Sequence, residues 1–433
     1  MSDQGRDLVA GDVLELSAEA KPVTETPIVS MPEHAIPVYA DSWQLAALPG
    51  PQADADYLTP DDLASLFSTT YTASLQSDRT GIRLEGLKPL TFSRESGGDG
   101  GGHPSNSCDH GYSVGALNLN GDTPGSSRPL KHGLSPETVA DLLAPKRLVL
   151  CPVDGPDLGG FVCVLAVVTT DHWKLGQIQP GDTLRFVEVD LASVAESRNA
   201  QDAWLSRIAH LIGKPDAAES VTDPFGAPVP TASPSDGILA RIPADAEQVQ
   251  PEISFRLSSD AGILAEVGEQ ALSFRTRAFT QLWENRLRER DIPGLQSFGP
   301  GTASLLLRFD PTKIDAQAIV QEMLATSAGL AQACLDSTVP SRRIHLPVVF
   351  DDAGSKECIE RYSRLTGRDE AVYLPSNVDY LSKINSFDST QALYDGFLAT
   401  DWYVSARAFF CGLPFLCPVS LPAIGAKSLR IAL

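Results

Sequence analysis

The sequence lacks the features that mark several common classes of protein. Its N-terminus has no basic start followed by an apolar run, so it predicts neither a signal peptide nor a transit peptide. No stretch reaches the ~18 apolar residues that a membrane-spanning helix needs. Basic residues are scarce, and the net charge of −21 argues against nucleic acid or an anionic membrane as a partner. We therefore expect a soluble, cytoplasmic protein.

Other familiar sites are missing as well. The seven cysteines include no Cys-x-x-Cys pair, so neither a zinc site nor a disulfide framework is indicated, and we expect no bound metal. The glycine run at 97–102 lacks the G-K-[ST] ending of a phosphate-binding loop. No G-x-S-x-G serine elbow occurs. These absences leave a globular protein of 433 residues, which is long enough for two or more domains.

The most informative stretch present is residues 77–124, where short segments of period two alternate with glycine. Glycine lets a ligand approach main-chain N–H groups, and guanidinium forks suit a carboxylate. The pattern favours a small anionic or amide ligand held on turns of a β-barrel or sandwich. The candidate residues are Arg79, Arg83, His103, Asn106, Asn118, Asn120 and Asp122.

Each candidate also has a structural interpretation. Arg79 and Arg83 either bind a carboxyl group or pair with Asp78 and Glu85. His103 is the side chain that titrates nearest neutral pH, although an exposed or structural role fits it equally. The alternatives for these residues stay open at the level of the sequence.

The asparagines and the aspartate also have both a ligand-binding and a structural interpretation. Asn118 and Asn120 lie two residues apart and so share one face of a strand, which favours a joint role in fixing an amide ligand. Asn106 taken alone suits a turn. Asp122 either acts as a base or completes a Gly-Asp turn.

The sequence predicts an N-terminal lead, two domains and a linker. Residues 1–27 are polar and predicted to be disordered, and 213–250 are rich in Pro, Ala, Asp and Ser, as in a linker. Thr59 and Pro60 begin a helix at 60–68, and apolar spacing predicts another at 190–212. After the linker, strand, helix, strand and helix follow one another as in ferredoxin-like units.

Several motifs of the sequence resemble one family. SDRTGIRLEG, GGDGGGHPSN, ALNLNGDTP, VDGPDLGGFVC and WKLGQIQPGDTLRF are similar to the carboxyltransferase region of urea carboxylase and urea amidolyase. RRIHLPVVFDD, VYLPSNVDYL and PFLCP resemble its following half. The resemblance implies a strand-rich α+β fold: a cyclophilin-like β-barrel, a ferredoxin-like αβ unit and a second, truncated cyclophilin-like barrel. It also implies a subunit 2-like subdomain A at 28–212 and a subunit 1-like subdomain B at 251–433, both modules of the kinase-inhibitor type.

Two segments depart from the family pattern. Residues 125–150 stand where the family passes within a few residues from GDTP to VDGPDLGG, so they are either a surface insertion or an error in the gene model. The end of the chain replaces a long stretch of the family's second barrel, so we expect that barrel to be truncated, either in the natural protein or by an error in the gene model.

The family's chemistry is the transfer of a carboxyl group from carboxybiotin to urea, giving allophanate. The resemblance implies catalytic roles for Arg83, His103 and Asp122. It implies substrate contacts for the remaining candidates, which are Arg79, Asn106, Asn118, Asn120, Lys174, Gln177, Ser376 and Asn377. For Lys174 and Gln177, a surface lysine and a turn glutamine are the alternative. Trp402 is interpreted as a core residue.

The chain lacks the methionine-flanked lysine that carries biotin in family carrier domains, and nothing in it resembles a biotin carboxylase. Carboxybiotin would therefore come from carrier and carboxylase domains on another chain. The alternatives are a non-catalytic regulatory or binding protein, like the kinase-inhibitor and 5-oxoprolinase-subunit proteins, and an inactive truncated fragment.

Overall fold

The computed structural model divides the chain into two compact units. It describes residues 39–120, 148–211, 235–338, 340–366, 374–407 and 413–419, with 13, 36, 37, 224–226 and 228–230. The smaller unit comprises residues 1–39 and 195–226 and holds most of helix α4 (Leu191–Leu211). In it the rings of Trp204 and Phe225 meet edge to face at 5.0 Å. Residues 40–194 and 227–433 form the larger unit.

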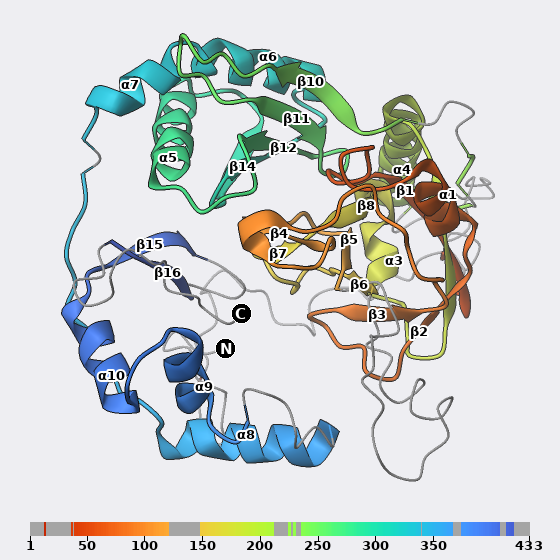
Figure 1. The fold of residues 1–433 in the computed structure, drawn as a ribbon. Coiled ribbons are helices and arrows are strands. Elements are labelled where there is room, and N and C mark those ends of the chain that lie inside the picture. The colour runs from red at the N-terminus through yellow and green to blue at the C-terminus, as the bar shows by residue number, and fades with distance from the viewer. Residues whose placement is uncertain are drawn as a thin grey trace. The chain divides into compact units, whose positions relative to one another are not determined.

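The first half of the larger unit is a closed barrel with the strand order β1-β8-β5-β6-β3-β2-β9 (Figure 1). Its strands are β1 (Ser42–Pro49), β2 (Tyr71–Ala73), β3 (Ile82–Glu85), β5 (Ala116–Leu119), β6 (Leu148–Leu150), β8 (Cys163–Val167) and β9 (Thr183–Glu188). β1 and β9 pair in parallel and complete the closure. Alternate side chains fill the interior, where the rings of Tyr71 and Phe186 meet at 5.4 Å. The predicted strand-rich α+β fold with an N-terminal barrel is thus confirmed.

Local signals place helix α1 (Pro60–Ser68) beside the barrel. The side chain of Thr59 accepts from the backbone N–H of Asp62, and the Asp62 carboxylate accepts from that of Thr59, which is a capping box. The same carboxylate also accepts from the backbone N–H groups of Thr91 and Phe92, at 2.9 and 3.0 Å. One side chain therefore fixes both the start of the helix and the loop before the glycine run.

A second, two-stranded sheet lies outside the barrel. It pairs β4 (Asn106–Gly111) with β7 (Leu158–Phe161), and a short 3-10 turn η3 (Gly98–Gly100) precedes β4. A further turn η4 (Thr169–Asp171) and helix α3 (His172–Leu175) follow β8. Of the predicted insertion at 125–150, only 148–150 is described, and these residues form strand β6 because they pair with both β3 and β5.

The second half of the larger unit is a five-stranded antiparallel sheet in the order β10-β11-β12-β14-β13. The strands are β10 (Ile238–Ile242), β11 (Ile253–Leu257), β12 (Gly262–Val267), β13 (Leu295–Pro300) and β14 (Ser304–Phe309); the helices are α5 (Phe274–Glu289), α6 (Ala316–Ser327) and α7 (Leu330–Asp336). One sheet face packs on the helices around the buried Trp283. β12-α5-β13-β14-α6 has ferredoxin-like connectivity, with β11 beside β12 in the place of the usual last strand.

Strand β10 corrects the predicted linker. Residues 238–242 lie inside 213–250, yet they pair with β11 at the edge of the sheet. The reason is packing, since Leu239, Ala240 and Ile242 are half-buried against the core of this domain. The linker is predicted from residue composition, and a short edge strand changes the composition of such a segment very little.

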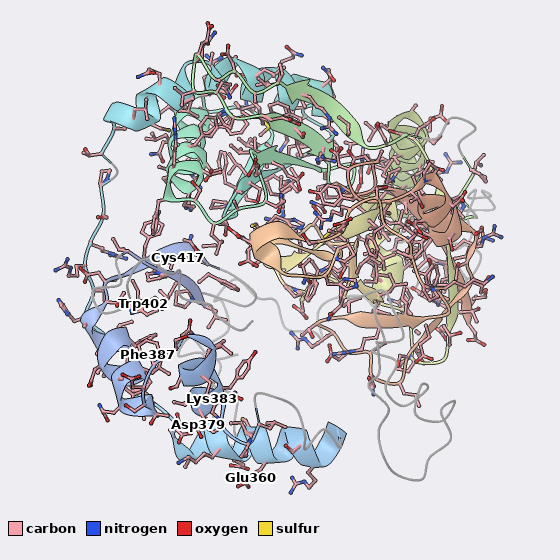
Figure 2. The ribbon with its side chains drawn as sticks, in the orientation of Figure 1. Glu360, Asp379, Lys383, Phe387, Trp402 and Cys417 are labelled. Atoms are coloured by element: carbon pink, nitrogen blue, oxygen red, sulfur yellow. The ribbon has the colours of Figure 1, made fainter. Side chains whose placement is uncertain are left out.

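The C-terminal region contains three helices and one hairpin among its described residues. They are α8 (Ala353–Thr366), α9 (Asn377–Ile384), α10 (Thr390–Ala399), β15 (Trp402–Arg407) and β16 (Pro414–Pro418). Where a second, truncated barrel is expected, the described strands form this two-stranded hairpin, on which Figure 2 marks Trp402 and Cys417. Trp402 is half-buried, and its indole donates to the carbonyl of Phe397 at 2.9 Å. None of the described helices is long and apolar enough to cross a membrane.

Candidate functional site

The barrel and the five-stranded sheet meet through charged side chains on the sheet face opposite its helices. Arg256 on β11 and Glu266 on β12 are both buried there, and their Nε and Oε2 atoms lie 2.8 Å apart. Arg256 also pairs with Asp54 at 2.7 Å and with Asp56 at 2.9 Å, from the segment after β1. Burial lowers the pKa of Arg256, but the charges of Glu266 and Asp54 among others raise it by more, so the guanidinium stays protonated.

Glu266 gathers two further groups from the barrel. The hydroxyl of Tyr57 lies 3.0 Å from each of its carboxylate oxygens, and Gln52 donates to Oε1 at 2.8 Å. The guanidinium of Arg94 lies 4.3 Å from the centroid of the Tyr57 ring. This charged network therefore holds the segment that leads into the glycine-rich loop against the second domain, which contains the five-stranded sheet.

Arg94 anchors that loop. Its Nε and Nη2 donate to the carbonyl of Pro104 at 2.9 and 2.7 Å, and Nη2 also donates to the carbonyl of Asn106. A Cβ added to Gly97 or Gly100 would lie closer than 3.0 Å to the backbone of Asn106 or of its neighbour on β4. Only glycine therefore allows the loop to lie directly against β4.

The loop is also tied to the second domain by Gln270. The backbone N–H of Asp99 donates to the Gln270 carbonyl at 3.0 Å, and that of Cys108 donates to its side-chain oxygen at 2.8 Å. In return, the Asp99 carboxylate accepts from the backbone N–H of Leu272. β4 is consequently held from both domains.

Asp109 lies in the middle of β4. It is half-buried, and its main-chain carbonyl accepts from the N–H of Thr302 at 2.9 Å in the turn between β13 and β14. On the other side, a Cβ on Gly160 of β7 would be 3.2 Å from its Oδ1. Burial raises the pKa of Asp109 to about 6. This carboxyl can therefore exchange a proton near neutral pH.

Three buried hydroxyl groups belong to the strands and turn around Asp109. Ser107 is on β4, Thr302 is in the turn, and Ser304 begins β14. Within the described part of the chain, their hydroxyl oxygens have no hydrogen-bond partner. A buried hydroxyl without a partner costs free energy, so a polar ligand that bonded to them would offset that cost. By contrast, His110 is buried with both ring nitrogens facing carbonyls, and burial lowers its pKa, as suits a structural histidine.

Two of the predicted site residues lie at this site. Asn106 begins β4, and its amide nitrogen lies against Gly101 of the loop. His103 accepts from the backbone N–H of Ser105 at 3.0 Å, and its ring meets that of Phe92 at 5.9 Å. Their ligand roles stay predictions.

Arg83 and Asn118 lie in one row across the outer face of the barrel, because both are opposite Val149 of the intervening β6. Arg83 is exposed, whereas Asn118 is buried and its Oδ1 accepts from the thiol of Cys163 at 2.7 Å. Asn120, which is exposed, lies just past the end of β5. The two asparagines that are predicted to act together therefore differ in environment, because Asn118 is buried and Asn120 is exposed.

The remaining candidates lie elsewhere. Arg79 pairs with Asp154 at 2.7 Å, which differs from both sequence-predicted partners. Lys174 is buried rather than on the surface, because its ammonium pairs with Asp171 at 2.9 Å and donates to the carbonyl of Gln44.

Three more candidates lie at or near helix ends, and one falls outside the described residues. Gln177 is exposed just after α3. Ser376 caps α9 by accepting from the backbone N–H of Asp379, and the exposed Asn377 begins that helix. Asp122 lies outside the described residues.

Two family models match the chain in the order of its two domains. The model of carboxyltransferase domain, subdomain A and B, matches residues 2–125 and 139–188. The model of carboxyltransferase domain, subdomain C and D, matches residues 253–423. The chain belongs to the carboxyltransferase-domain family. The resemblance drawn from the motifs is thereby confirmed.

Curated relatives link this carboxyltransferase domain to urea-degrading enzymes. A protein of Emericella nidulans assigned as a urea carboxylase is 33% identical over an aligned length of 431 residues, and the alignment covers 96% of this chain and 32% of that protein. The urea amidolyase of Saccharomyces cerevisiae is 28% identical over 96% of this chain and 21% of its own length. The carboxyltransferase domain therefore spans a third or less of these relatives.

Solved structures share the fold. The crystal structure of Kluyveromyces lactis urea carboxylase superposes with a TM-score of 0.69 at 24% identity, over 90% of this chain and 31% of that one. The K. lactis urea amidolyase gives a TM-score of 0.70 over 90% of this chain and 21% of its own. The carboxyltransferase fold is common to all three.

Sequence reasoning missed the centre of the site. Asp109 follows a serine and a cysteine in a strand too irregular to show alternation. Arg256 and Glu266 did leave a signal, because each is a charged residue inside an apolar strand, where a single charge is costly unless it is paired. Their pairing could not be read from one sequence.

Proposed function

We propose that the chain carries out the carboxyltransferase half-reaction of a urea carboxylase. In this reaction the carboxyl group of carboxybiotin, presented on a carrier belonging to another polypeptide, is transferred to urea to give allophanate. The observation that carries the proposal is that subdomains A/B and C/D follow one another in one chain whose relatives are named urea carboxylase and urea amidolyase. The carrier and the biotin carboxylase would be partners, because the half-reaction consumes the carboxybiotin that they supply.

We assign the groups around Asp109 to holding a small ureido compound or carboxylate. Hydroxyls of Ser107, Thr302 and Ser304 are buried without partners in the described structure and can donate to an oxygen atom. When bound, carboxybiotin supplies a labile carboxyl group on a ring nitrogen. The hydroxyls would orient oxygen atoms, and the loop anchored by Arg94 would limit access of water.

Asp109 is the residue to which we assign proton transfer. A nitrogen of urea must lose a proton as it forms the new bond to carbon, and a carboxyl with a pKa of about 6 can accept it near neutral pH. The urea nitrogen forms the new N–C bond with its lone pair, and the pair of its broken N–H bond becomes the new lone pair. The pair of the broken N–C bond of carboxybiotin would stay on the biotin ring nitrogen, which would take up the released proton. The predicted roles of Arg83, His103, Asp122 and the substrate-contacting candidates remain part of this proposal, with the carboxyl group as the ligand of Arg83.

The test is an assay of the purified chain with a carboxylated biotin carrier. Carboxybiotin consumption should depend on urea and yield allophanate in equal amount, and Asp109→Asn should lower kcat by roughly 10²-fold or more. Glu357→Gln, which removes an exposed carboxylate from α8, is the matched control and should leave kcat unchanged. Binding of urea or carrier without turnover would support the alternative regulatory function, and absence of both binding and turnover would support the inactive fragment.

A further inference from the structure

The second domain contains a cavity that the carboxyltransferase site does not use. Its volume is about 460 Å³, which lies within the usual size of small-molecule sites. The cavity is formed by the loop between β10 and β11, the first turns of α5, and α7. Its lining residues are Ala244, Asp245, Ala246, Val249, Gln250, Pro251, Arg275, Thr276, Phe279, Ala331 and Cys334. None of them belongs to the groups described around Asp109.

The walls are mainly apolar and the loop is held in a fixed shape. Phe279 and Ala331 form buried parts of the wall. The carboxylate of Asp245 accepts from the backbone N–H groups of Glu247 and Gln248, at 2.9 and 3.1 Å, so it is already used within the loop. Val249 has a φ of 57°, a left-handed conformation that is strained for a β-branched residue. Such a loop is preorganised, so a ligand need not order it.

One cation faces this apolar surface. Within the described residues Arg275 forms no ion pair, although the chain as a whole carries a net charge of −21. Its guanidinium lies near Cys334, where the charges of Arg275 and Arg286 oppose the rise that burial causes in the pKa of the thiol. The planar guanidinium of Arg275 beside an apolar wall suits a ligand with a single carboxylate and a hydrocarbon chain. A phosphate would require more donors than this lining provides.

We propose that this cavity binds an aliphatic monocarboxylate of medium chain length, with the carboxylate on Arg275 and the chain along Val249, Phe279 and Ala331. The site is separate from carboxyl transfer and does not depend on the proposed function. Cys334 makes the site measurable, because a ligand that fills the cavity covers its half-buried thiol.

The experiment follows the alkylation rates of individual cysteines in the full chain by peptide mass spectrometry, with octanoate as the probe. Octanoate should slow alkylation of Cys334 by roughly tenfold and leave the exposed Cys358 unchanged as an internal reference. Octanol, which has the same chain length without the charge, should protect Cys334 much less. Equal protection by octanol, or none by octanoate, overturns the proposal.

A pair of variants tests whether protection depends on the guanidinium of Arg275 or only on the net charge of the protein. Arg275→Leu should abolish the protection by octanoate, whereas Arg342→Leu removes an exposed arginine outside the cavity and should retain it. Ala246→Trp, which fills the cavity from an exposed position, should abolish binding even if Arg275→Leu fails to fold. Retained protection in Arg275→Leu or in Ala246→Trp, with native circular dichroism, contradicts the assignment.

Discussion

At the scale of single residues, Asp109 is a carboxyl surrounded by glycines and main-chain groups. Among the described residues no cation pairs with it, and burial is what moves its pKa from 3.8 to about 6. The native protein therefore holds a proton that the unfolded chain has lost between these pH values. The free energy of unfolding falls as pH rises through this window, because the native state binds more protons than the unfolded state.

Replacing Asp109 by Asn should remove that pH dependence. Two pKa units correspond to about 3 kcal/mol at most, so Asp109→Asn should gain up to that stability at pH 8 and almost none at pH 3.5. Guanidinium chloride unfolding at both pH values measures the difference. Asp310→Asn is the contrasting control: hydrogen bonds from Thr312 lower the pKa of Asp310 to about 2, so this variant should lose stability at pH 8. A gain for Asp109→Asn that is equal at both pH values would contradict the assignment.

At the scale of elements, the glycine-rich loop and β4 act as one piece. Gly100 approaches the backbone of Ser107 and Cys108 so closely that a methyl group cannot fit without moving β4. Gly102, two residues further on, has nothing within 4 Å of its Cβ position. The same substitution should therefore have different consequences at the two positions.

Gly100→Ala should destabilise the protein by about 1–3 kcal/mol through overpacking, whereas Gly102→Ala should change it by less than about 1 kcal/mol. Chemical denaturation gives both values. Hydrogen exchange of the β4 amides should rise in Gly100→Ala alone. Equal effects of the two variants would show that contact with β4 is not what requires glycine.

The elements also show what one sequence can reveal. Helix α1 was predicted at 60–68 and lies at Pro60–Ser68, because its cap and first-turn proline are local signals. Strand β10 was missed, since its stability comes from β11 and a distant core. The motifs indicated the family and singled out Asn106 and His103, which lie beside the glycine-rich loop and whose ligand roles stay predictions. They could not reveal Asp109, whose pKa depends on residues brought together by folding.

At the scale of the whole molecule, Glu266 connects the two domains of the larger unit. It is buried and shared by Arg256, Tyr57 and Gln52, which come from both sides. The nearby pair of Arg241 and Glu252 is 3.1 Å apart but exposed. Exposed pairs contribute little, while removing one partner of a buried pair leaves an uncompensated charge.

Glu266→Leu should therefore cost about 3–5 kcal/mol, compared with about 1 kcal/mol or less for Glu252→Leu. In differential scanning calorimetry the parent chain should unfold 40–194 and 235–336 in one transition, and Glu266→Leu should separate them into two. Similar melting curves for the two variants would mean that other contacts join the domains.

Closure of the barrel by β1 and β9 has a consequence for aggregation. Every barrel strand has a neighbour on both sides, whereas β10 and β13, at the borders of the five-stranded sheet, each have one side that no described strand pairs with. Such borders can accept a strand from another molecule. We therefore expect aggregation of this protein to begin at 238–242 or 295–300. A lysine placed in either strand should reduce aggregation in concentrated samples.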